Sequence, residues 1–271
     1  MSVERPIYEN REFYGPLELS KTAPEMRYRY MLEHPDDPTR LIRTTDEGLY
    51  INKADMDAQV TIAQYVLEEL KEHSVNHVNP TFIDETSDSG EPYMLITVDE
   101  LTDATAYREL IRNDSLTPDQ AQEADHALCG MLEYLKDVVH NDGYYDPEMM
   151  NLDQFAYCPS LPNGQKMVLV DVEPIGGKVF NPDEDSIEFG CASDFAATVA
   201  TLITDAITLS NKSKRPIKSL RKAAEIVLLL PGESEMTEKL KSDLLQAIDS
   251  CELTPELEYY AKGVLVDTED F

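Results

Sequence analysis

The chain has 271 residues, of which 42% are hydrophobic and 28% are charged, so it can form a sizeable core and is not largely disordered. Its formal net charge is −30, which weighs against nucleic acid and anionic membrane surfaces as partners and favours basic proteins or cations. The four cysteines match no metal-binding pattern, and no apolar run approaches the roughly 20 residues of a membrane span, so we expect a cytoplasmic protein.

The N-terminal part of the sequence lacks a regular pattern. Residues 1–38 are rich in proline and aromatic residues and are expected to form an irregular arm. Residues 40–51 contain two short apolar runs around the Asp-Glu-Gly triplet at 46–48, which predicts a hairpin of two strands.

A helix and two strands are predicted next. Apolar residues recur at helical spacing over 57–72, and an aspartate, Asp55 or Asp57, is expected to cap this helix. Residues 73–80 are expected to form a turn. Short apolar segments then predict strands at 81–84 and 93–98.

From residue 101 onward the pattern is mainly helical. A helix is expected over 101–112, and a longer one begins at Thr117, a suitable cap, and ends at Asn-Asp-Gly 141–143. Residues 166–172 read as a short buried strand. Later helices are expected at 195–209, 218–230, 237–247 and from residue 254.

This order of elements predicts an α+β protein with two lobes. A small β-rich N-terminal lobe is expected over 39–100 and a larger helical C-terminal lobe over 101–271, with residues 1–38 as the arm.

The most informative stretch for function lies between residues 140 and 171. Asp146 and Asn151 are five residues apart, and Asp171 ends the apolar strand that follows. In this order an aspartate can orient an acceptor hydroxyl, while an amide oxygen and a carboxylate suit a hard cation such as Mg²⁺. Phosphoryl transfer needs these parts and little covalent chemistry from the protein.

This stretch resembles the catalytic loop and metal-binding segment of the protein-kinase-like superfamily, nearest to its aminoglycoside and choline phosphotransferase branch. The resemblance implies a two-lobed kinase-like fold, with Asp146 as the catalytic residue and Asn151 and Asp171 as ligands of Mg²⁺ beside ATP. Asp194, at the start of a later helix, is similar to the aspartate that braces the catalytic loop, and residues 93–100 resemble the strand that hinges the lobes.

The sequence departs from the family pattern in the nucleotide-binding region. No glycine-rich loop is present, and the phosphate-binding lysine has no clear equivalent. Arg43 and Lys53 are the candidates for the cation that contacts the nucleotide phosphates. The glutamate that usually pairs with this cation would fall on the following helix, near Gln59 or Gln64, with Glu68 and Glu69 further on.

The catalytic loop also departs from the family pattern. Tyr144 stands where the family has a histidine, whereas His140 and Asp142 offer the expected H-x-D pattern nine residues before Asn151. The spacing to Asn151 favours Asp146 over Asp142 as the catalytic-loop aspartate. His140 is then expected to support the structure of the loop.

Two functions follow from these features. The first is a phosphotransferase that uses ATP and Mg²⁺ to phosphorylate a small hydroxyl-bearing molecule. The alternative is a non-catalytic, pseudokinase-like module that binds a partner protein, for which the acidic charge favours a basic one. The intact spacing of Asp146, Asn151 and Asp171 favours the first, and the altered nucleotide-binding region favours the second.

Overall fold

The computed structural model describes residues 32–34, 36–45, 49–87, 90–101, 103–112, 116–141, 143–180, 192–213 and 217–227. The chain divides into two compact units. Unit 1 comprises Met1–Thr61, Val78–Thr102 and Val172–Ile175, and unit 2 comprises Ile62–His77, Asp103–Asp171 and Gly176–Phe271.

Unit 1 is built around a four-stranded antiparallel sheet with the strand order β1-β2-β5-β4. Its strands are β1 (Leu32–Glu33), β2 (Arg40–Thr44), β4 (Thr81–Thr86) and β5 (Pro92–Asp99). The interior strand β5 is buried from residue 93 to residue 98. A strand that is buried on both faces reads as a continuous apolar run, which is why β5 could be predicted.

The hairpin predicted over residues 40–51 is wrong. Its first strand forms as β2, but residues 49–52 are bends, and β2 pairs with β1 and β5 instead. Thr45 follows the strand. Its N–H donates to the Met94 carbonyl at 2.9 Å, and its side-chain hydroxyl accepts the Met94 N–H at 2.9 Å. β5 therefore occupies a position beside β2 that the second strand of the hairpin would have taken.

The first helix, α1 (Lys53–Glu72), begins four residues earlier than predicted. Asn52 caps it, because its side-chain oxygen accepts the N–H of Asp55 at 3.1 Å. Asp55 in turn accepts the N–H of Ile51 at 2.9 Å. The cap is therefore an asparagine, and Asp55 lies within the first turn.

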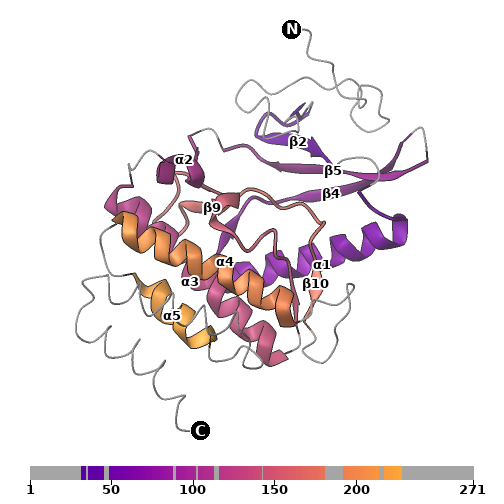
Figure 1. Ribbon diagram of the computed structural model, residues 1–271. Coiled ribbons are helices and arrows are strands. Elements are labelled where there is room, and N and C mark those ends of the chain that lie inside the picture. The colour runs from indigo at the N-terminus through magenta and orange to yellow at the C-terminus, as the bar shows by residue number, and fades with distance from the viewer. Residues whose placement is uncertain are drawn as a thin grey trace. The chain divides into compact units, whose positions relative to one another are not determined.

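Unit 2 contains most of the helices. α3 packs against α4 and α5, and the three helices lie side by side in Figure 1. Thr117 caps α3 as predicted, since its hydroxyl accepts the Gln120 N–H at 3.2 Å and its own N–H reaches the Gln120 side chain at 2.8 Å. The helices are α2 (Tyr107–Arg112), α3 (Pro118–Asn141), α4 (Ala192–Ser213) and α5 (Lys218–Val227).

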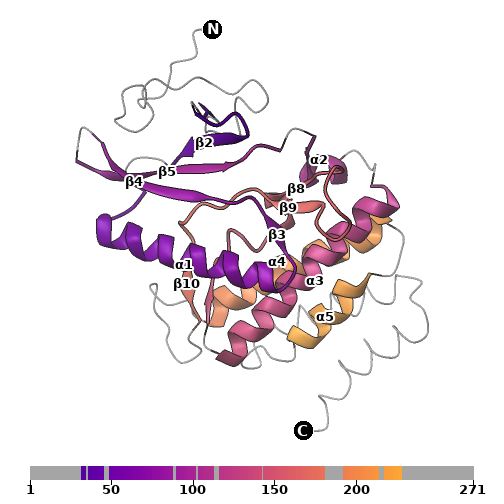
Figure 2. The ribbon, with the colours of Figure 1, turned by 180° about the vertical axis from the view of Figure 1, so that it is seen from behind.

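Two small sheets complete unit 2. One has the order β3-β9-β8-β6, with β3 parallel to β9, and Figure 2 shows β3 beside β9. The other pairs β7 with β10, and a short helix η1 precedes β8. The elements are β3 (Asn76–His77), β6 (Thr105–Ala106), β7 (Tyr144–Tyr145), η1 (Leu152–Gln154), β8 (Phe155–Tyr157), β9 (Met167–Leu169) and β10 (Lys178–Val179).

The structure confirms the α+β class and the order of a β-rich part followed by a mainly helical part. The turn expected at 73–80 contains the strand β3, and the helix expected at 101–112 is shorter because β6 precedes it. The helices expected at 237–247 and from residue 254 lie outside the described residues, as does the arm up to residue 31. Across the described part of the chain, no helix is long and apolar enough to cross a membrane.

Gly130 allows α3 to approach the end of α1 closely. This close approach leads to a prediction about the stability of the fold. A Cβ atom at this position would lie 2.5 Å from the His73 carbonyl oxygen and 2.6 Å from Val75 Cγ2. We therefore expect Gly130→Ala to lower the free energy of unfolding by about 1–3 kcal/mol in urea denaturation, despite the better helix propensity of alanine. Gly143→Ala is the matched control, because its nearest contact would be 3.4 Å away. An unchanged midpoint for Gly130→Ala would contradict this packing.

Candidate functional site

Asp146, the predicted catalytic residue, follows β7 in unit 2 and is fully buried. Its Oδ1 accepts the N–H of Glu148 at 2.9 Å, and the N–H groups of Met149 and Gly176 also stabilise the carboxylate. Gly176 is required here, because a Cβ atom at that position would collide with Oδ1. The carboxylate therefore lies in a cradle of backbone N–H groups and has no exposed surface.

The electrostatics of Asp146 follow from this burial. Burial raises the pKa of the carboxyl from 3.8 to about 7, and the surrounding N–H groups offset only part of this rise. Oδ2 is also buried, and it has no hydrogen-bond partner among the residues that the structure describes. Near neutral pH, the neutral and charged forms of Asp146 are therefore both populated.

Asn151 and Asp171, the predicted metal ligands, lie at the same end of the β8–β9 pair. Gln154 links the two segments, since its N–H donates to the Asn151 carbonyl at 3.0 Å. Its own carbonyl accepts the N–H groups of Val170 and Asp171 at 2.9 and 3.4 Å. The backbone pairing thus brings Asn151 and Asp171 into one local unit.

The donor set at this end of the sheet fits Mg²⁺ only in part. Asp171 is half-buried, and its carboxylate is the kind of ligand that Mg²⁺ prefers. The Asn151 side-chain oxygen, however, already accepts the N–H of Asp153 at 2.8 Å and caps η1. Among the described residues, no group of three or more His, Cys, Asp or Glu side chains is arranged to hold a metal ion.

Arg43, one candidate for binding nucleotide phosphates, is buried on β2 in unit 1. Its Nη2 lies 3.3 Å from Oε2 of Glu173, and both side chains are about 5% exposed. The glutamate partner was expected on the helix after Arg43, but it comes from the segment that follows Asp171. The charge of the guanidinium is therefore compensated within unit 1.

Lys53, the other candidate, is the first residue of α1 and is 62% exposed. Its ammonium lies 2.5 Å from Asp84 and 3.2 Å from Asp57. Hydrogen bonds to Asp84 and Asp57 raise the pKa of Lys53. In the sequence Lys53 follows the hairpin expected over residues 40–51, and the structure places it beside two carboxylates at the start of α1.

Of the two predicted supporting residues, His140 and Asp194, the structure describes the side chain of His140 alone. His140 is exposed in the last turn of α3, and its Nδ1 lies 2.7 Å from the Lys136 carbonyl oxygen, so its contact is with its own helix. Asp194 lies on α4, but its side chain is outside the described residues, as is the alternative catalytic residue Asp142.

Asp205 is a residue of this region that the sequence analysis missed. It lies on α4, and its Oδ2 accepts the N–H of Leu152 at 3.0 Å, which braces the turn that carries Asn151. Burial raises the pKa of Asp205 to about 6, against the lowering effect of that N–H. The sequence held a signal for it, because Asp205 is the only charged residue in the predicted helix at 195–209.

Comparison with known protein families and with curated protein sequences gives no match. Among solved structures, the chain is similar to WaaP in complex with acyl carrier protein, with 12% identity and a TM-score of 0.43, over 85% of this chain and 88% of that one. It is also similar to a mutant of the PAN3 pseudokinase from Neurospora crassa, with 10% identity and a TM-score of 0.45, over 96% of this chain and 66% of that one. Both are likenesses of fold between chains of low sequence identity.

Proposed function

We propose that the chain is a non-catalytic, kinase-like module that binds a partner protein. The observation that carries this proposal is the burial of Asp146, whose carboxylate is enclosed by backbone N–H groups and by the close approach of Gly176. A group that orients an acceptor hydroxyl must come within hydrogen-bond distance of it. In the arrangement of the described residues, the carboxylate of Asp146 has no exposed surface that an acceptor hydroxyl could contact.

The two candidate phosphate-binding cations support the same proposal. Arg43 is buried against Glu173, and Lys53 lies between Asp57 and Asp84. A nucleotide would have to compete with these carboxylates for both cations, in a chain whose net charge is −30. That charge favours a basic protein as the partner of the module.

A phosphotransferase that uses ATP and Mg²⁺ on a small hydroxyl-bearing molecule is the second candidate. The specific observation in its favour is that Asn151 and Asp171 lie at the same end of the β8–β9 pair. These two residues would hold Mg²⁺, which would neutralise charge on the nucleotide phosphates. Asp146 would orient the acceptor only after the backbone at Gly176 moved away from it.

The nucleotide dependence of thermal unfolding tests the proposal. We expect no change in melting temperature when ATP is added with Mg²⁺ or with Mn²⁺. A ligand at about 100 times its dissociation constant would stabilise the fold by about 2.7 kcal/mol, which corresponds to several degrees. The measurement therefore has ample range to reveal binding.

A shift that depends on the metal ion would contradict the proposal and support the second candidate. Asp171→Asn should then abolish the shift, and Glu68→Gln is the matched control, because Glu68 is an exposed carboxylate on α1. A shift that Asp171→Asn leaves unchanged would show nucleotide binding without the predicted metal ligand.

A further inference from the structure

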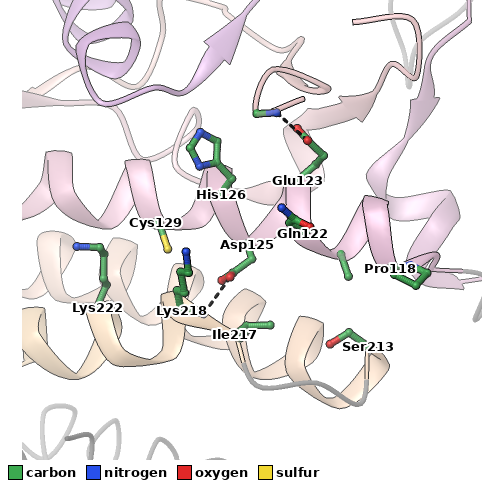
Figure 3. A pocket seen from close by; sticks show the side chains of 12 residues that line it. Pro118, Gln122, Glu123, Asp125, His126, Cys129, Ser213, Ile217, Lys218 and Lys222 are labelled. Carbon is green, nitrogen blue, oxygen red and sulfur yellow. Dashed lines mark hydrogen bonds between the residues drawn. The ribbon is translucent and has the colours of Figure 1, made fainter. Parts of the chain in front are cut away.

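A cavity of about 530 Å³ lies in unit 2 between α3 and α5, beside the end of α4 (Figure 3). It is separate from the residues discussed above. Its apolar wall includes Ala121 and Ile217, both of which are buried. Cavities of this size hold small organic molecules, and they combine an apolar lining with a few polar groups.

The carboxylates that line the cavity already have hydrogen-bond donors. Glu123 accepts the backbone N–H groups of Gly164 and Lys166 at 2.7 and 3.0 Å. Asp125 accepts the first two N–H groups of α5 at 2.9 and 2.8 Å, and Figure 3 shows the first of these bonds, from Lys218. Each carboxylate oxygen is thus engaged by one backbone donor, which reduces its demand for a ligand that donates hydrogen bonds.

Three side chains that line the cavity and can donate hydrogen bonds have no such partner among the described residues. The Lys218 ammonium has no ion-pair partner among the described residues, although its backbone N–H is bound to Asp125. Within the same described part of the chain, the exposed imidazole ring of His126 and the exposed side-chain amide of Gln122 also have no hydrogen-bond partner. The ammonium can only donate hydrogen bonds, so a ligand that binds Lys218 must supply an acceptor, which His126 and Gln122 can also contact with their N–H groups.

The charge of the surrounding sequence points the same way. Residues 212–222 contain six of the chain's 23 lysines and arginines and no aspartate or glutamate, and two of the six, Lys218 and Lys222, line the cavity. This is a local reversal in a chain with a net charge of −30. Figure 3 shows Lys218 and Lys222 rising from α5 toward α3, and Lys222 also pairs with Glu133.

We propose that this cavity binds a small organic anion, that is, an apolar body that carries a phosphate or a carboxylate group. The anionic group binds near Lys218, with His126 and Gln122 as further donors, and the apolar body lies against Ala121 and Ile217. The Lys218 ammonium, beside carboxylates that already accept backbone N–H groups, favours an anionic group over a neutral one.

Isothermal titration calorimetry on the full chain tests this proposal with phenyl phosphate, benzoate and phenol, three probes that share an aromatic body. We expect at least one of the two anions to bind about tenfold more tightly than phenol, and the stronger of the two identifies the preferred anionic group. Lys218→Gln should weaken that binding about tenfold. Lys71→Gln, at an exposed lysine on α1, should leave it unchanged.

Equal affinity for phenol and for both anions would overturn the proposal, as would the absence of anion binding or a Lys218→Gln variant that binds normally. A second measurement, the alkylation of Cys129, tests whether the anion binds in this cavity, because Cys129 lines it. Burial raises the pKa of the Cys129 thiol to about 12, so its alkylation is slow and is best followed by mass spectrometry at alkaline pH. The bound anion should slow the alkylation of Cys129 further, and an unchanged rate would place the ligand elsewhere and overturn the proposal.

Discussion

Asp146→Asn is expected to become more stable relative to the wild type as the pH rises from about 4 to about 8. The folded state raises the pKa of Asp146 to about 7, whereas the ordinary value is 3.8. At about 1.4 kcal/mol per pKa unit, this difference corresponds to about 4 kcal/mol. The expected result is therefore a stability difference between variant and wild type that changes by about 4 kcal/mol across this pH range.

The sign follows from proton binding in the two states. Below pH 3.8 the Asp146 carboxyl is protonated whether the chain is folded or unfolded, so its titration contributes nothing. Between 3.8 and about 7 the unfolded state loses the proton and the folded state keeps it, so the free energy of unfolding of the wild type falls with pH. Above about 7 the penalty is complete and constant.

Asparagine removes this titration and keeps the acceptor that the local backbone uses. Its side-chain oxygen can take the place of Oδ1 and accept the Glu148 N–H. Its amide group would then occupy the place of Oδ2, which has no partner among the described residues, at a cost of about 1–3 kcal/mol at every pH. We therefore expect a net gain in stability at pH 8 and a net loss at pH 4.

Urea denaturation followed by far-UV circular dichroism at several pH values measures this difference. Glu68→Gln removes the same charge at an exposed position, and its stability relative to the wild type should vary little with pH. If Asp146→Asn also differs from the wild type by a constant amount at all pH values, the carboxyl is not buried as described. The gain at pH 8 is expected whether or not the chain is an enzyme, so nucleotide binding remains the test of function.

Local patterns in the sequence predicted the elements that are long or continuous. The amphipathic pattern of α3 and its Thr117 cap lie within one segment, as does the apolar run of β5, so each could be predicted from neighbouring residues. The two-residue strands β3 and β6 could not be predicted, because too few residues are involved to show a period. The second strand of the predicted hairpin does not form, because β2 pairs with β5, which lies about 50 residues away in the sequence.

The proximity of two predicted site residues has the same local origin. The order of Asp146, Asn151 and Asp171 follows the chain, and the β8–β9 pair that joins the last two is a local hairpin. Two contacts depend on residues far apart in the sequence: the pair of Arg43 with Glu173, and the bond from Leu152 to Asp205. The burial of Asp146 also depends on Gly176, which no local spacing connects to it.

The buried pair of Arg43 and Glu173 leads to the second large expected effect. Arg43→Met and Glu173→Leu should each lower the free energy of unfolding by about 3–5 kcal/mol, because each removes one member of a buried ion pair and leaves the charge of the other in the core of unit 1. Replacing both partners together, as Arg43→Met with Glu173→Leu, should cost much less than the sum of the single changes. Urea denaturation of the four proteins, arranged as a double-mutant cycle, measures the coupling between the two side chains.

Lys53 and Asp84 provide the matched control, because they form an ion pair of similar type on the surface of the same unit, with side chains that are 62% and 59% exposed. Solvent screens such a pair, so Lys53→Met should change the urea midpoint little. Additive effects at Arg43 and Glu173 would show that the two side chains do not stabilise each other. A strong coupling would instead show that Arg43 is committed to holding the segment after Asp171 against the sheet, and a nucleotide could recruit its charge only by breaking that pair.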